Sequence, residues 1–180
     1  MGEISKWLMH DEQKDLFEIL VASTLNIVFL VLIALLLWPV AKPVLALRLA
    51  GGYAILWIAT AIIAALVNRL QSFFRLDIYT HVDAYVISNL VVSCFLQAGW
   101  SAFAALSVRD FVAGTTLWLT VLLYLVGVLS CLIAYFAVSS FFQGHIYKII
   151  SLPLGLLGFI VFSVWPAIGR AIYGWFFDFF

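Results

Sequence analysis

The chain has 180 residues, of which 66% are hydrophobic, 17% are aromatic and only 10% are charged, far from the composition of soluble proteins. Nine basic and nine acidic residues give a formal net charge of zero, so the chain lacks the basic field that nucleic-acid binding requires. We therefore expect an integral membrane protein that crosses the bilayer several times and binds no nucleic acid.

The first third of the chain contains two predicted membrane spans. Residues 1–15 mix apolar and charged side chains in a pattern that predicts a short helix lying in the membrane interface, with a frayed polar tail as the alternative. The apolar run at about 17–38 has the roughly 20 residues that cross a hydrocarbon core of ~30 Å. A short proline-containing loop leads to the second apolar run, at about 49–67, so we expect these two helices to form an antiparallel hairpin.

The middle of the chain contains two further predicted spans. Residues 68–83 interleave apolar and charged side chains, which is typical of a loop or short helix at the level of the lipid headgroups. The third apolar run follows, at about 84–106. Ser107 and Asp110 then have the spacing of a capping box, which predicts that a fourth helix begins near residue 108 and covers about 109–136.

The last apolar run is bracketed by prolines. Pro153 and Pro166 enclose too few apolar residues to cross a membrane, so we expect a fifth helix over about 146–165. Residues 167–180 are rich in aromatic side chains, which favours an interfacial anchor, and a kinked continuation of the fifth helix is the alternative. The predicted fold is all-α, a polytopic helical bundle forming one transmembrane domain over residues 1–180, with about five spans, short loops and interfacial segments at both ends.

The odd number of predicted spans places all three histidines on one membrane face. His10, His81 and His145 share this face with Asp83, and imidazole and carboxylate groups suit zinc, iron or manganese. A divalent metal is therefore one interpretation, although no pair has the i, i+4 spacing of a helical metal motif. On the other interpretation these side chains are solvated or hydrogen-bonded in the interface, and we predict no cofactor. Basic residues divide five to four between the two faces, which leaves the membrane orientation open.

The third predicted span carries a polar seam. Asn89, Ser93, Gln97 and Trp100 fall within about 80° of one another on a helical wheel. Because an amide facing lipid is costly, we expect the seam to face other helices or a hydrated path, and this helix to be the most buried span. Hydrogen bonding between helices is the simpler interpretation and a substrate path is the alternative.

Small residues four positions apart predict close packing of the second, third and fourth helices. The predicted packing pairs are Ala61 and Ala65, Ala98 and Ala102, and Gly127 and Cys131.

The sequence contains no motif that names a reaction, and function follows only from what the spans carry. We expect an accessory or scaffold subunit of a larger membrane assembly without catalysis of its own, because no charged residue is expected at mid-membrane. Its partners would be the bilayer and other membrane subunits, or a second copy of the chain. The first alternative is a small transporter or channel that uses the polar seam. The second is a membrane metal-dependent enzyme with the histidine and aspartate site. The partner, the substrate and the particular membrane are not predicted.

Overall fold

The computed structural model describes residues 43–73, 78–142 and 145–177, together with scattered helical positions between 21 and 35. These residues form helices joined by short connections, without strands in the described ranges. The helices are α2 (Pro43–Phe73), α3 (Ile78–Val112), α4 (Leu117–Phe141), α5 (His145–Val164) and α6 (Pro166–Phe177). The predicted interfacial segment 1–15 and most of the predicted span 17–38 lie outside the described residues.

Three of the described helices are long and apolar enough to cross a membrane. The candidate spans are Val44–Val67, Ile87–Val112 and Leu117–Phe141, with 24, 26 and 25 residues. At a rise of about 1.5 Å per residue each exceeds a ~30 Å hydrocarbon core. α5 contributes a shorter apolar segment, Ile149–Val164. The all-helical fold is thus confirmed for the described residues and is compatible with a multi-pass membrane protein, while the count of five spans stays a prediction.

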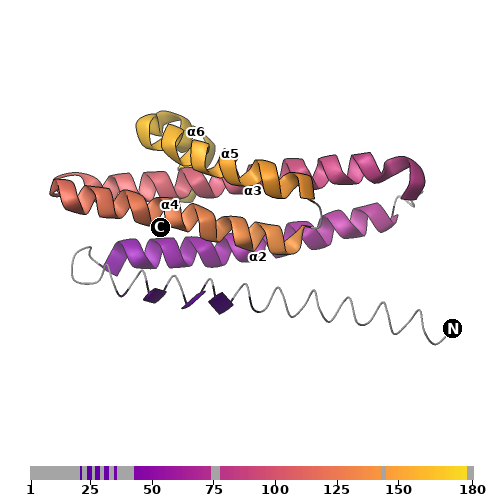
Figure 1. Ribbon diagram of the computed structural model, residues 1–180, viewed down its shortest axis with the longest axis horizontal. Helices are drawn as coiled ribbons and strands as arrows, with labels where there is room; N and C mark the ends of the chain where they lie inside the picture. The colour runs from indigo at the N-terminus through magenta and orange to yellow at the C-terminus, as the bar shows by residue number, and fades with distance from the viewer. Residues whose placement is uncertain are drawn as a thin grey trace.

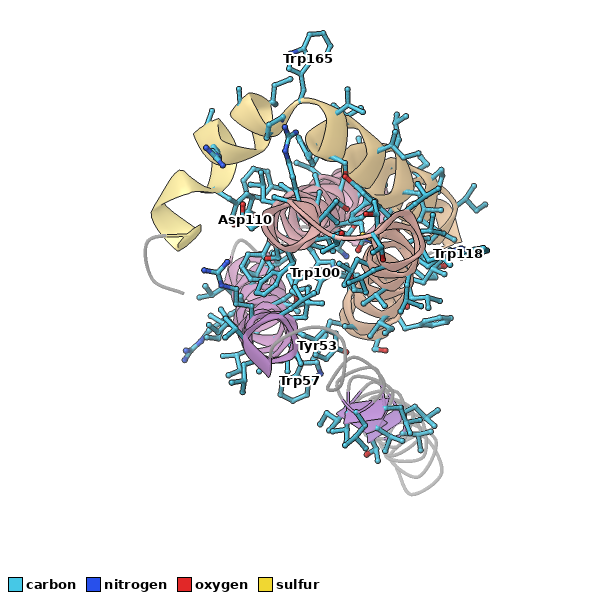
Figure 2. All side chains as sticks on the ribbon, turned by 90° about the vertical axis from the view of Figure 1, so that its left-hand side faces the viewer. Tyr53, Trp57, Trp100, Asp110, Trp118 and Trp165 are labelled. Carbon is cyan, nitrogen blue, oxygen red and sulfur yellow. The ribbon has the colours of Figure 1, made fainter. Side chains whose placement is uncertain are left out.

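α3 lies at the centre of the bundle. Figure 1 shows α2, α3 and α4 side by side along the length of the molecule, and Figure 2, viewed along that length, shows α3 surrounded by the other helices. In the most apolar stretch of each helix, the buried share is 72% for α3, 50% for α4 and 22% for α2. The prediction that the third helix is the most buried span is confirmed for these three helices.

α2 packs on α3 through one glycine and three aromatic residues. A Cβ on Gly52 would overlap the ring of Phe103, so the absence of a side chain allows the helices to approach closely. The ring of Tyr53 meets Trp100 edge to face, with centroids 6.0 Å apart. These contacts fix the inner face of α2, while its outer face is exposed.

The predicted capping box is wrong. α3 continues through Ser107 and Asp110, and Ser107 is fully buried in the bundle instead of capping a new helix. The chain turns later, at Gly114, whose φ of 84° lies in the left-handed region that glycine adopts without strain. The helix expected at 109–136 therefore begins only at Leu117. The spacing was misleading because α3 runs past the motif, so Ser107 lies in the interior of a helix where there is no helix N-terminus to cap.

α5 and α6 form an arch over α3. The fifth helix begins within a residue of its predicted start and contains Pro153, but it ends at Val164, before the Trp165-Pro166 pair. Figure 1 shows α6 nearly end-on, and Figure 2 shows it running across the bundle away from α5. α6 follows after the one-residue break at Trp165, which is compatible with a kinked continuation, and its Tyr173 contacts α3 at Gly99. Its placement in the membrane interface stays a prediction.

Candidate functional site: the polar seam of α3

The polar seam is buried at the centre of the bundle. The exposed fraction is 2% for Asn89, zero for Ser93 and Gln97 and 3% for Trp100. Residues at i, i+4, i+8 and i+11 share one face of an α-helix, which is why the folding of α3 alone aligns them. Packing of α4 and α5 against α3 then removes them from the surroundings of the bundle.

Two side chains of the seam bind the backbone of α4. Nε2 of Gln97 donates to the carbonyl oxygen of Cys131, and Nε1 of Trp100 donates to the carbonyl oxygen of Ser130, each at 2.9 Å. A helical carbonyl has a second lone pair and can accept such a bond in addition to its own helical one. In membrane proteins an interhelical hydrogen bond contributes about 0.6–1.7 kcal/mol. These two bonds fix the position of α4 along the axis of α3.

The hydroxyl groups of the seam are satisfied mostly within their own helices. Ser93 and Ser101 of α3 and Ser130 of α4 each donate to a carbonyl three or four residues earlier, at 3.0, 2.7 and 2.7 Å. The thiol of Cys131 lies 3.8 Å from the hydroxyl of Ser101. Serine commonly bonds its own helix in this way inside membranes, so these residues need no ligand to be buried.

α5 closes the seam with small residues that the sequence analysis missed. A Cβ on Gly155 would overlap the side-chain amide of Gln97, and a Cβ on Gly158 would lie 3.4 Å from that of Ser101. Ser151, one helical turn before Gly155, is 1% exposed. The spacing of Ser151 and Gly155 is itself small-xxx-small, and this signal in the fifth apolar run would have predicted the contact.

Four oxygen atoms of the buried polar residues have no hydrogen-bond partner among the described residues. They are Oδ1 of Asn89, Oε1 of Gln97 and the hydroxyls of Ser107 and Ser151. Each such group costs about 1–3 kcal/mol of desolvation. Two of these oxygens, on Asn89 and Gln97, belong to the seam, which is therefore more polar than its two interhelical bonds require.

Two of the cavities formed by the described residues lie between helices of the bundle, and of the seam residues Trp100 lines one of them. A cavity of about 140 Å³ lies between α2, α3 and α6, with Gly99, Trp100 and Tyr173 in its wall. Burial raises the pKa of the Tyr173 hydroxyl above its ordinary value. A groove of about 450 Å³ lies between α4 and α5. Neither is lined by Asn89 or Gln97.

The predicted packing pairs have different outcomes. Ala102, Gly127 and Cys131 are buried and Ala98 is half-buried. A Cβ on Gly127 would overlap the ring of Phe159 from α5, so this glycine admits an aromatic side chain instead of a helix backbone.

The pair on α2 does not pack inward. Ala61 is half-buried and Ala65 is exposed, whereas Ala64 is 6% exposed. The inner face of α2 passes through Tyr53 and Thr60, which a search for small residues does not find.

The candidate metal residues are not described at the level of their side chains. His10 lies outside the described residues, whereas His81 and Asp83 lie in the first turns of α3 and His145 begins α5. In the segment 68–83, expected to be a loop or short helix, residues 68–73 continue α2 and residues 78–83 begin α3, and its place at the headgroup level stays a prediction. Within the residues whose side chains are described, no group of three His, Cys, Asp or Glu could hold a metal. The metal site stays an untested hypothesis.

Comparisons with protein-family models, with curated proteins and with solved structures give no match for this chain. A functional proposal therefore depends on the geometry of the bundle.

Proposed function

We propose that the protein is a membrane-embedded accessory or scaffold subunit of a larger membrane assembly, without catalysis of its own. The observation that supports this most is the use of the seam. The side-chain donors of Gln97 and Trp100 are both directed at backbone carbonyls of α4. The polar atoms thus hold the bundle together, and neither described cavity brings Gln97 to its wall.

The outer face of α2 is the surface best suited to a protein partner. α2 is the least buried of the three candidate spans, and its outward side chains at Ile55, Ile58, Ile62 and Leu66 are all exposed and apolar. This row is spaced three or four residues apart, so it forms one continuous stripe along the helix. A stripe of this kind accepts either lipid or a helix of another subunit.

Co-purification tests the proposal. The full chain, tagged and extracted with its native lipids, should bring one or more membrane proteins in stoichiometric amount. Ile62→Trp, which enlarges the outer stripe of α2, should release them, whereas Leu129→Trp on the exposed face of α4 should retain them. A chain that purifies alone from its native membrane, with both variants behaving identically, would rule out the scaffold role.

A transporter or channel is the second candidate, and the unpaired buried oxygens favour it. Oε1 of Gln97 and the hydroxyl of Ser151 are buried with spare hydrogen-bonding capacity, as the wall of a closed polar path requires. Flux through liposomes containing the purified chain tests this function. Flux that Gln97→Met removes without loss of stability would replace the scaffold proposal.

A further inference from the structure

The groove between α4 and α5 has apolar walls along most of its length. Val121, Tyr124, Leu125 and Val128 of α4 form one wall, and Phe159, Ile160 and Val164 of α5 form most of the other. Its volume is about 450 Å³ and it is open to the outside of the bundle. Because α4 is a candidate membrane span, this opening faces hydrocarbon when the chain is in a bilayer.

One end of the groove is polar, and a cation lies beside it. Thr120 and Ser163 line this end. The guanidinium of Arg109 lies beside it, because its Nη1 donates to the carbonyl oxygen of Ser163 at 2.8 Å. Arg109 is exposed, and a guanidinium has five N–H donors, so most of its donors remain available after this one bond.

The neighbouring acid does not neutralise Arg109. Asp110 accepts from Nη1 of Arg48 on α2, with an N–O distance of 3.5 Å. Figure 2 shows Asp110 on the side of α3 that faces α2, away from the α4–α5 groove. Arg109 contacts a neutral carbonyl, which does not compensate the positive charge of the guanidinium. This charge lies beside the polar end of the groove. A phosphate is the complementary group, because its oxygens match the paired donors of a guanidinium.

Two tryptophans mark the depth of this polar end. Trp118 lies two residues before the wall formed by α4 and is 85% exposed, and Trp165 directly follows the wall formed by α5 and is 65% exposed. Figure 2 shows both pointing away from the bundle. Exposed tryptophan is enriched at the headgroup level of membranes. The cation therefore lies at the depth of lipid phosphates, and the apolar walls extend from there towards the hydrocarbon.

We propose that the α4–α5 groove binds a phospholipid, with the phosphate on Arg109 and one acyl chain lying along the groove, over the edge-to-face pair of Tyr124 and Phe159. Cationic sites between membrane helices are known to hold lipid headgroups. This site is separate from the polar seam and does not depend on the scaffold role. The polar end and the apolar walls together specify an amphiphile, because a free phosphate would leave the walls uncovered and a bare chain would leave the charge unpaired.

Native mass spectrometry of the purified full chain, titrated with dioleoylphosphatidylglycerol, tests the proposal. Arg109→Gln should weaken binding about tenfold, as the loss of one charged contact predicts. Arg170→Gln removes another exposed cation, on α6, and should leave the affinity unchanged. Val128→Phe fills the groove without changing charge and should weaken binding as well.

Competition and folding controls complete the experiment. Neither inorganic phosphate nor dodecanol should displace the lipid, because each provides half of its contacts. Arg109→Lys keeps the charge and should restore part of the affinity, which separates loss of binding from loss of fold. Displacement by inorganic phosphate would overturn the proposal in favour of a free-anion site, and displacement by dodecanol in favour of a purely apolar groove. Equal affinity of Arg109→Gln, Val128→Phe and the natural chain would also overturn it.

Discussion

Replacement of Gln97 by methionine measures what the polar seam contributes. Methionine is unbranched and close in volume to glutamine, so it avoids the overpacking against Gly155 that a branched side chain would cause. The change removes the 2.9 Å bond from Nε2 to the carbonyl of Cys131. That carbonyl belongs to the interior of α4, where the helical backbone supplies a second donor, so it is not left unpaired.

Two opposing effects set the magnitude. Loss of the interhelical bond destabilises the bundle by about 0.6–1.7 kcal/mol. Removal of Oε1, which is buried without a described partner, recovers part of the ~1–3 kcal/mol of desolvation that it costs. We therefore expect a net loss near the lower end, about 0.5–1 kcal/mol, because relaxation and partial solvation reduce the recovered part.

Reversible unfolding in mixed micelles, followed by far-ultraviolet circular dichroism, measures this difference. Ser93→Ala is the matched control, because its hydroxyl bonds its own helix and its removal should change the free energy of unfolding by less than about 0.5 kcal/mol. A Gln97→Met protein at least as stable as the natural chain would refute the reasoning, because the desolvation recovered with Oε1 would then equal or exceed the contribution of the bond to α4.

Three further changes test the surrounding contacts in the same assay. Gly155→Leu should cost about 1–3 kcal/mol, since the new side chain overlaps the glutamine amide, and Gly158→Ala should cost less because its Cβ meets tight but not overlapping contacts. Trp100→Phe removes the indole donor to α4 and should cost about 0.6–1.7 kcal/mol; no change would show that the bond is replaceable. Arg48→Gln breaks a partly exposed pair with Asp110 and should cost less than about 1 kcal/mol, and a larger loss would mean that the pair orders the α3–α4 turn.

The central part of the fold could be predicted because the solvent constrains it strongly. A membrane helix with two amides and a tryptophan on one face has to bury that face, and α3 does so around Asn89 and Gln97. The helical period and the cost of an amide in hydrocarbon are sufficient for this prediction. They do not identify the partner, so the backbone carbonyls of Ser130 and Cys131 could not be predicted as the acceptors.

The turn between α3 and α4 could not be placed by the same argument. Ser107 and Asp110 satisfy a local capping pattern, but the side chains meet distant groups, and Ser107 is buried within the bundle while Asp110 pairs with Arg48. Tertiary contacts of this kind are invisible to a four-residue motif. Gly114 was the local signal that decided the turn, because its left-handed backbone ends α3.

The contacts between the helices are those expected where no hydrophobic driving force acts between helices, as in a bilayer. Lipid is as apolar as the helix surfaces, so association depends on close contact and on hydrogen bonds. α5 provides the close contact through Gly155 and Gly158, and the glutamine and tryptophan of α3 provide the bonds to α4. α2 is held less firmly. Its close contact with α3 is at Gly52, and most of its surface is not buried in the bundle. A weakly held helix with an apolar outer stripe is the element of this bundle most readily shared with a partner, and the proposed subunit role therefore predicts that partner contacts concentrate on α2.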